Sequence, residues 1–326
     1  MTGDFARILV IRLGALGDFV LSLGPCAAIR RHHKGAHITL LTTEPFVEFA
    51  RMSGYFDEIW VDSRPRLFDL GGWLALRRRL RAGRFGRVYD LQTSDRTAIY
   101  FRLMGPGPRP EWSGVARGAS HPDRNPDRRR VHTADRQRAQ LRQAGIDDVP
   151  PPDLSWARSD IRRFGLPPSF ALLVPGGAAH RPEKRWPAWR YGELAERLAD
   201  RGVAPVLIGG AAEAEAADEI ARRCLAVRSL VGETSLADLA VLAREAVGAV
   251  GNDTGPMHLI AAAGCPSVVL FSRASDPART APRAPAGRPP VTVVKRDDLA
   301  ALSTDEVALA FSAALNQAGQ RRSVVR

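Results

Sequence analysis

The residues best suited to chemistry follow one buried strand of the expected fold. Residues 249–258 are Ala-Val-Gly-Asn-Asp-Thr-Gly-Pro-Met-His, and an apolar run continues to Gly264. Asp253 and Thr254 favour a helix N-cap, and Pro256 suits the first turn of a helix. The backbone N–H groups at a helix start lack partners within the helix, so they bind anions, most often phosphate. Capping alone also accounts for these residue types, so both interpretations stay open.

Two further turns have a similar character. Residues 175–187 are Pro-Gly-Gly-Ala-Ala-His-Arg-Pro-Glu-Lys-Arg-Trp-Pro, which combines glycines for the close approach of a ligand with a cationic rim. Residues 12–18, Arg-Leu-Gly-Ala-Leu-Gly-Asp, form the first strand-to-helix turn. This turn lacks the Gly-x-Gly-x-x-Gly fingerprint, which disfavours a nicotinamide-dependent oxidoreductase.

Together, the three motifs resemble glycosyltransferase family nine, the ADP-heptose:lipopolysaccharide heptosyltransferases, over residues 8–282. The resemblance implies an inverting, metal-independent enzyme without a cofactor that moves a heptose from ADP-heptose to an inner-core lipopolysaccharide acceptor. It implies that Asp18 is the general base and that Arg12 contacts the acceptor. Lys184 would neutralise the donor's diphosphate, and the other expected donor ligands are His180, Glu213, Asp253, Thr254, Gly255 and His258.

The residues themselves leave alternative roles open. A carboxylate in a partly desolvated cleft can take the proton of an acceptor hydroxyl, but Asp18 also suits a helix N-cap. The resemblance gives Glu213 the ribose hydroxyls of the donor, whereas Glu215 is a rival, and acidic residues favour any helix start. Asp253 would repel phosphate, so we expect it to bond backbone N–H groups or a sugar hydroxyl.

One departure from the family pattern concerns the phosphate loop. The family usually has a Ser or Thr early in this loop, where this chain has Ala178. The missing hydroxyl motivates one alternative, a nucleotide-binding family member with reduced or no transferase activity. A transferase that uses another nucleotide sugar is a separate alternative, because the sequence does not fix the sugar of the donor. Backbone N–H groups with His180 and Arg181 could replace the hydroxyl.

The charge of the chain implies an anionic partner. The 326 residues include 47 basic and 35 acidic ones, for a formal net charge of +12. Residues 64–142 contain 19 arginines, no lysine and seven acidic residues. This region lacks the interleaved aromatic residues and the modules of nucleic-acid binding, so no nucleic-acid partner is expected. A solvated face, a phosphorylated lipopolysaccharide acceptor and an anionic membrane surface remain as explanations.

Cysteine content and hydropathy indicate the cytoplasm. The three cysteines, Cys26, Cys224 and Cys265, have neither metal-ligand nor redox spacing, and their odd number argues against a disulfide framework. No apolar run reaches the ~20 residues of a membrane span. Any membrane contact would therefore be peripheral, on the inner face of the inner membrane. No Asp-x-Asp pair is present to chelate a metal with a nucleotide sugar.

Alternating apolar strands and helices predict an α/β fold of two Rossmann-like domains that face each other across a cleft, the glycosyltransferase B fold. The resemblance implies an acceptor-binding domain over residues 1–157 and a nucleotide-sugar-binding domain over 158–302, with a helix of about 303–326 that packs back on the first domain. Expected strands are 7–11, 37–42, 58–61, 87–91, 170–174, 205–208 and 247–250. Expected helices are 18–31, 46–52, 72–81, 134–144, 189–201, 213–223 and 304–314. Residues 105–135, rich in Pro, Gly, Arg and Asp, are expected to form an irregular basic loop.

Overall fold

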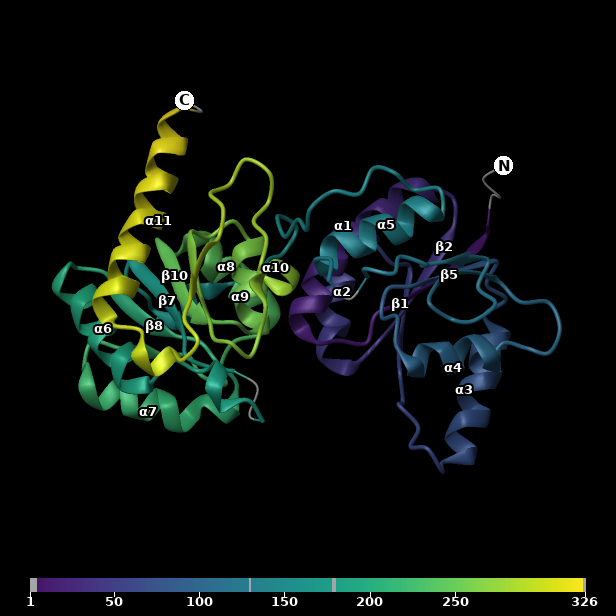
Figure 1. The fold of residues 1–326 in the computed structure, drawn as a ribbon, viewed down its shortest axis with the longest axis horizontal. Coiled ribbons are helices and arrows are strands. Elements are labelled where there is room, and N and C mark those ends of the chain that lie inside the picture. Colours follow the sequence, from purple (N-terminus) through teal and green to yellow (C-terminus); the bar gives the residue numbers. More distant parts are fainter. Residues whose placement is uncertain (1–4, 129, 178–179, 325–326) are drawn as a thin grey trace. The chain divides into compact units, whose positions relative to one another are not determined.

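The computed structural model describes residues 5–128, 130–177 and 180–324, with side chains through Gln320. The chain forms two compact units, Met1–Pro152 and Asp153–Arg326. Each unit is built on a six-stranded sheet whose paired strands all run parallel (Figure 1). Ala178, which departs from the family pattern, lies outside the described residues.

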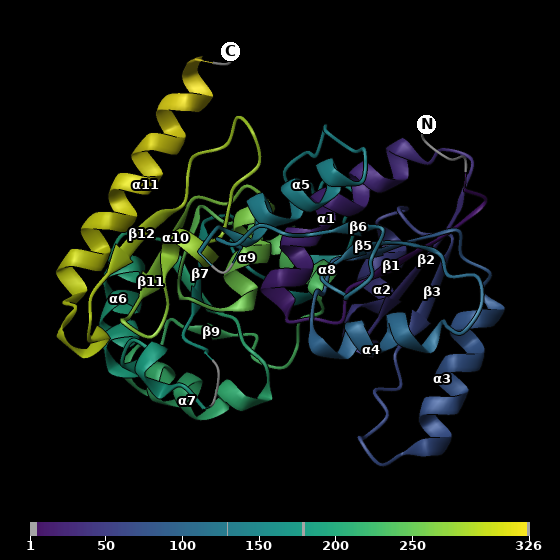
Figure 2. The same ribbon diagram turned by 45° about the vertical axis from the view of Figure 1, so that its right-hand side comes forward.

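The sheet of the first unit has the order β3-β2-β1-β4-β5-β6. Its strands are β1 (Arg7–Ile11), β2 (His37–Thr42), β3 (Glu58–Val61), β4 (Arg87–Asp90), β5 (Glu111–Gly114) and β6 (His121–Pro122). Its α-helices are α1 (Leu16–His32), α2 (Val47–Met52), α3 (Leu70–Ala82), α4 (Asp95–Leu103) and α5 (Thr133–Gln143). Helices α1 and α5 lie together on one side of this sheet, and α3 and α4 lie on the other (Figure 2). Because both faces are covered, β1 is an uninterrupted apolar run.

The sheet of the second unit has the order β12-β11-β10-β7-β8-β9. Its strands are β7 (Phe170–Val174), β8 (Ala204–Leu207), β9 (Arg228–Ser229), β10 (Gly248–Asn252), β11 (Ser267–Phe271) and β12 (Thr292–Lys295). Its α-helices are α6 (Ala188–Asp200), α7 (Ala214–Arg223), α8 (Leu236–Glu245), α9 (Gly255–Ala262), α10 (Pro277–Thr280) and α11 (Thr304–Val324).

Short 3-10 helices occur in both units. They are η1 (Glu44–Phe46) in the first unit and η2 (Ile161–Phe164), η3 (Pro182–Lys184), η4 (Ala211–Glu213) and η5 (Leu299–Ala301) in the second.

Both sheets have a point at which the strand order reverses. In the first unit, the chain builds outward from β1 in one direction and from β4 in the other. In the second unit, the same reversal lies between β7 and β10. Ligands of open parallel sheets bind outside the carboxyl ends of the strands at such points. The turns after β1, β4, β7 and β10 are therefore the places to look for a site.

Two expectations, for the basic segment and for the C-terminal helix, can be compared with the structure. The prediction of an irregular loop over residues 105–135 is wrong, because β5 and β6 lie within it and extend the first sheet. Trp112 of β5 is fully buried, and its ring lies 5.1 Å from that of Phe101. Helix α11 agrees with the expected C-terminal helix of about 303–326 and is longer than the stretch 304–314 whose pattern reads as helical; it packs against α6, β10, β11 and β12 of its own unit. The expected contact of this helix with the first unit stays a prediction.

Candidate functional site

Asp18 lies at the reversal point of the first sheet. Strand β1 ends at Ile11, and Asp18 stands in the first turn of α1. The N-cap residue of α1 is Ala15, so the alternative that Asp18 is the N-cap is wrong. One carboxylate oxygen of Asp18, Oδ2, lies 2.8 Å from Nη2 of Arg12, and the Asp18 side chain keeps 44% of its surface exposed. Asp18 is thus held by a cation and still open to a substrate.

Arg12 holds this carboxylate through an ion pair from a buried position. The side chain is only 2% exposed, and its Nη1 donates to the carbonyl oxygen of Leu91 at 2.6 Å. Burial lowers the pKa of Arg12, and the charge of Asp18 opposes this effect. The guanidinium therefore links the end of β4 to the first turn of α1. The expected contact of Arg12 with the acceptor stays a prediction.

The turn between Arg12 and Asp18 is tightly held. The N–H of Leu13 donates to Oε1 of Gln92 at 2.9 Å. The Leu13 carbonyl accepts from Oγ1 of Thr43 at 3.2 Å and from Nη2 of Arg64 at 2.9 Å. Gly14 has φ 124°, and a Cβ atom there would lie 3.3 Å from the ring of Phe46. Only glycine adopts this conformation without strain, so the backbone itself positions Asp18.

Two charged residues near Asp18 escaped the sequence analysis. Asp90 ends β4, is fully buried, and accepts from the Thr93 N–H at 2.8 Å. Burial raises the pKa of Asp90 to about 6. Arg136 of α5 has a lowered pKa because of burial and of the charge on Arg128, while Asp18 acts in the opposite direction. The sequence feature that could have revealed Asp90 is a carboxylate at the end of a predicted strand.

The second unit brings Lys184 and Asp253 together. Lys184 ends η3, and Asp253 directly follows β10. Their Nζ and Oδ2 atoms are 2.6 Å apart, and the two side chains are only 13% and 7% exposed. The structure pairs the Asp253 carboxylate with the lysine, and the expected bonds to backbone N–H groups or a sugar hydroxyl stay a prediction.

Asn252, which the sequence analysis did not select, joins the loops around this ion pair. Its side chain is fully buried, and Nδ2 donates to the carbonyl oxygens of Pro175 at 2.8 Å and Gly176 at 3.1 Å. Its Oδ1 accepts from the backbone N–H of Trp186 at 3.0 Å and from the hydroxyl of Tyr191 at 3.1 Å. One amide thus ties the loops after β7 and η3 to the end of β10. The sequence feature that could have revealed Asn252 is an amide side chain at the end of a predicted buried strand.

Glu213 lies at the ends of β7 and β8. Its Oε2 accepts from the N–H of Gly210 at 2.8 Å. Cβ atoms added at Gly176 and Gly209 would each lie 2.9 Å from the Glu213 side chain, so both glycines make room for it. Glu215, the rival residue, is exposed in the first turn of α7. The contacts with the phosphate-loop glycine therefore distinguish Glu213.

The other expected donor ligands lie on the same loops or on α9. Thr254 is the N-cap residue of α9, although its side chain forms no capping hydrogen bond within the described residues. Gly255 begins this helix, and His258 is buried in its first turns. His180 is exposed on the loop between β7 and η3. Their contacts with a donor stay predictions.

Among the groups singled out from the sequence, the structure thus pairs Arg12 with Asp18 in the first unit and Lys184 with Asp253 in the second. Across the described part of the chain, no three or more His, Cys, Asp or Glu side chains gather in a way that could hold a metal ion. The three cysteines are buried and form no disulfide within the described residues. None of the described helices has both the length and the apolar character needed to cross a membrane.

Comparison with known proteins gives consistent matches. A family model described as glycosyltransferase family 9 (heptosyltransferase) matches residues 73–289. Lipopolysaccharide heptosyltransferase 2 of Escherichia coli is 28% identical over 293 residues, which cover 82% of this chain and 83% of that protein. Lipopolysaccharide heptosyltransferase 1 of Pseudomonas aeruginosa is 27% identical over 281 residues, 81% of this chain and 78% of that protein.

Solved structures agree with these matches. The structure of the E. coli ADP-heptose lipopolysaccharide heptosyltransferase II has a TM-score of 0.78 and 25% identity, covering 95% of this chain and 99% of that chain. A glycosyl transferase family 9 structure from Veillonella parvula has a TM-score of 0.82 at 22% identity, with 97% and 99% covered.

Proposed function

The chain belongs to glycosyltransferase family 9, and on this premise we propose that it transfers a heptose from ADP-heptose to an inner-core acceptor of lipopolysaccharide. The relatives that match over most of this chain are named lipopolysaccharide heptosyltransferases, and one of them is named for ADP-heptose. The two sheets have the glycosyltransferase B fold of that enzyme. The family model and these names together support the choice of sugar and acceptor.

The proposed mechanism rests on one observation, the half-exposed carboxylate of Asp18 in an ion pair with the buried Arg12. We assign it the role of general base, which takes the proton of the acceptor hydroxyl as that oxygen bonds to the anomeric carbon of the heptose. The bond from this carbon to the ADP oxygen breaks on the opposite side, so the configuration inverts. Arg12 binds Oδ2, which leaves the exposed part of the carboxylate for the acceptor.

The second unit supplies the groups that a nucleotide diphosphate requires. Lys184 would neutralise the negative charge that develops on ADP as it leaves, and the N–H groups at the start of α9 would bind the phosphates. Glu213 would accept hydrogen bonds from the ribose hydroxyls. A cation and a helix start together can serve a leaving diphosphate, so we propose a reaction without a metal. These roles make residues 1–157 the acceptor domain and 158–302 the donor domain.

Such an enzyme would work in the cytoplasm, at the inner face of the inner membrane, because its acceptor carries a lipid anchor. The alternatives are a transferase for another nucleotide sugar and a family member that binds nucleotide without turnover. Both share the same fold, so ligand binding and turnover must be measured separately.

Calorimetry tests the donor first. We expect selective binding of ADP over UDP, GDP and NAD that persists in EDTA. Lys184→Ala should weaken this binding, because it removes the cation, whereas Lys295→Ala, an exposed lysine of β12, should not. Selective binding of another nucleotide would point to a different donor, and no ADP binding would refute the donor site.

A transfer assay tests the base. Asp18→Asn should abolish heptose transfer and leave the affinity for ADP nearly unchanged, because the substitution keeps the size of the side chain and removes its basicity. Asp147→Asn is the matched control, since Asp147 is an exposed acid of the same unit with 81% of its side chain exposed. Full activity of Asp18→Asn would remove Asp18 as the base. Binding of ADP without turnover by the wild type would favour the non-catalytic alternative.

A further inference from the structure

An apolar patch with an arginine rim stands on the first unit, away from the residues assigned above. The side chains of Leu67, Phe68, Leu70 and Leu74 are 73%, 90%, 74% and 61% exposed. They lie at the start of α3 and in the segment before it, which extend from the sheet on the side opposite to α1 and α5 (Figures 1 and 2). Soluble proteins seldom expose so many large apolar side chains in one place, and such patches mark interaction sites.

The exposed face of α3 changes from apolar to cationic along its length. Leu70, Leu74, Arg77, Arg78 and Arg81 recur at the spacing i, i+4, i+7, i+8 and i+11, which places them on one stripe of the helix. The core contacts of α3 lie on another face, where Leu76 and Leu80 are buried. The exposed leucines therefore do not serve the core of this unit.

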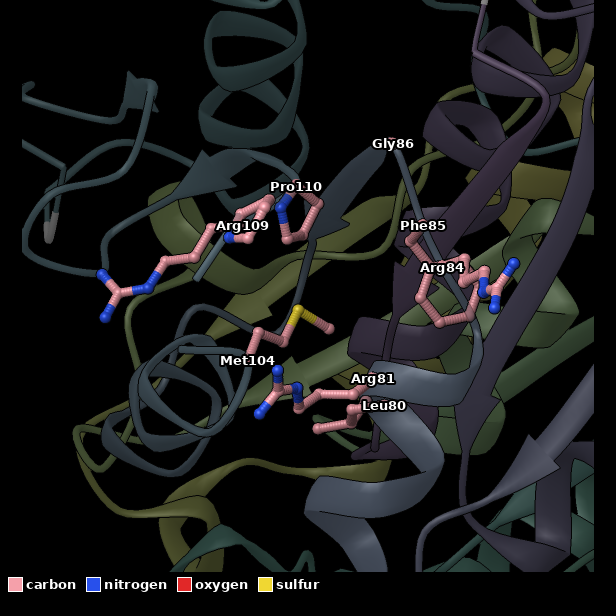
Figure 3. A pocket seen from close by; sticks show the side chains of 9 residues that line it. Leu80, Arg81, Arg84, Phe85, Gly86, Met104, Arg109 and Pro110 are labelled. Atoms are coloured by element: carbon pink, nitrogen blue, oxygen red, sulfur yellow. The ribbon is translucent and has the colours of Figure 1, made fainter. Parts of the chain in front are cut away.

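The arginine rim continues past the end of α3. A hollow of about 340 Å³ is lined there by Arg81, Arg84 and Arg109 together with the apolar side chains of Phe85 and Met104 (Figure 3). From Arg64 to Arg84 the chain has seven arginines and a single acidic residue, Asp69, whose Oδ1 accepts from Gly72 N–H at 2.8 Å as the N-cap of α3. The surface therefore combines protruding apolar groups with a strong positive charge.

The segment before α3 is fastened to the fold, so the apolar side chains are presented on a fixed support. The indole N–H of Trp73 donates to the Arg66 carbonyl at 2.9 Å, and the Trp73 ring lies against that of Tyr100. At the other end of the segment, Arg64 donates to Leu13 in the turn that precedes Asp18. The patch and the turn that positions Asp18 are thus parts of one connected structure.

We propose that this docking surface, made of Leu67, Phe68, Leu70 and Leu74 with the rim Arg77, Arg78, Arg81 and Arg84, binds a bilayer that contains anionic lipids. The leucines and Phe68 enter the boundary of the hydrocarbon, and the arginines reach lipid phosphates with their alkyl stems along the apolar surface. This assignment gives a specific surface to the peripheral membrane contact proposed above, and lipid binding tests it without any transferase measurement.

The positive charge of the arginine rim argues against a second copy of the chain as the partner that covers the docking surface. A twofold dimer brings the same patch of both subunits together. Here such contact would place arginine rim against arginine rim, with Asp69 as the single acid of the segment to offset them. An anionic lipid surface supplies the missing counter-charge, because its phosphates attract arginines that lie close to it.

Flotation with vesicles tests the docking surface. The wild type should bind vesicles of phosphatidylethanolamine and phosphatidylglycerol, bind vesicles of phosphatidylcholine weakly, and lose affinity as salt is raised. The double variant Phe68→Ser/Leu74→Ser should bind at least about tenfold more weakly, since burial of each such side chain contributes about that factor. Arg78→Gln/Arg81→Gln should lose a similar factor on the anionic vesicles alone.

Matched controls come from the second unit. Leu225 and Leu309 are 94% and 74% exposed, so Leu225→Ser/Leu309→Ser removes equal apolar surface elsewhere. Arg201→Gln/Arg222→Gln removes the same charge. Controls that lose as much binding as the test variants would overturn the proposal, as would equal binding to both kinds of vesicle. Wild-type dimers that become monomers in Phe68→Ser/Leu74→Ser without lipid would overturn it in favour of a second copy.

A label at the centre of the patch gives an independent readout. The three native cysteines are buried, so Phe68→Cys introduces a thiol that can be labelled selectively with an environment-sensitive fluorophore. Its emission should shift to the blue on anionic vesicles, and that of labelled Leu225→Cys should not. An unchanged emission at position 68 would overturn the proposal. ADP binding and transfer to a lipid-free acceptor should be unchanged in Phe68→Ser/Leu74→Ser, so a failure of the transferase assignment is recognised separately.

Discussion

The substitution Asn252→Asp tests how the second cluster is held together. It preserves the shape of the side chain and the Oδ1 acceptor for Trp186 and Tyr191. It removes the two N–H donors to the carbonyl oxygens of Pro175 and Gly176, and each buried acceptor left without its donor costs about 1–3 kcal/mol. We therefore expect the free energy of unfolding to fall by about 3–5 kcal/mol at neutral pH, where the carboxylate also faces two carbonyl dipoles.

This loss should depend on pH with a defined sign. Burial and the nearby carbonyl groups raise the pKa of the introduced carboxyl in the folded state above the ordinary aspartate value of about 3.9. Stability is then present below that value and is lost as pH rises through the folded-state pKa. Once protonated, the carboxyl can donate one of the two missing hydrogen bonds, so the cost at pH 4.5 should be about half of that at pH 7.5.

Urea unfolding at these two pH values is the assay, with hydrogen exchange of the peptides that contain β7 and β10 to assign the transition. The matched control is Asn316→Asp, because Asn316 is exposed on α11. It should change the free energy of unfolding by less than about 0.5 kcal/mol. A loss below about 1 kcal/mol for Asn252→Asp, or a loss independent of pH, would refute the role given to this amide.

Three further predictions address the two clusters. Burial raises the pKa of Asp90 to about 6. The free energy of unfolding of the wild type should therefore fall by about 2–3 kcal/mol relative to that of Asp90→Asn as pH rises from 4 to 7. The same pH dependence of urea unfolding in both proteins would contradict this. Gly14→Ala should cost about 1–3 kcal/mol, because alanine is strained at φ 124° and contacts Phe46; a variant with wild-type unfolding and transfer would show that the turn relaxes. Asp253→Asn should tighten ADP binding in calorimetry about five- to tenfold, since it removes a negative charge beside Lys184; weaker binding would mean that the carboxylate itself contacts the donor.

The strands that sequence predicts best are those buried on both faces. The predicted bounds 7–11, 37–42 and 170–174 coincide with β1, β2 and β7, because strands covered by helices are continuous apolar runs. The bounds 58–61 also coincide with β3, although this edge strand is only partly buried. The run Ser-Val-Val-Leu-Phe at 267–271 carries the same signal, so β11 was predictable too. Strand β5 was not, because its four residues Glu-Trp-Ser-Gly lie among prolines, glycines and arginines. The strand instead rests on non-local contacts, namely its pairing with β4 and β6 and the packing of Trp112 against the ring of Phe101.

The candidate site was predictable in location and only partly in its contacts. Parallel strands bring their carboxyl ends to one edge, so turns after β1, β7 and β10 could be assigned to ligand binding from their order alone. The partners within each cluster depend on which loops meet. The pairing of Lys184 with Asp253 spans 69 positions, and the bonds from Asn252 to Pro175 and Gly176 span 77 and 76. No local pattern encodes such distances.

Burial indicates what each ion pair can do. In the first unit the cation is the covered partner, with Arg12 at 2% and Asp18 at 44% exposure, so the carboxylate is the accessible group of this pair. In the second unit both partners are covered, with Lys184 at 13% and Asp253 at 7%. A diphosphate can use the full charge of this lysine only by competing with Asp253 for it. We infer that the start of α9 contacts the phosphates first and that the lysine then changes partner. On this proposal Lys184 must leave Asp253 to bind a diphosphate, whereas the exposed part of the Asp18 carboxylate needs no such exchange.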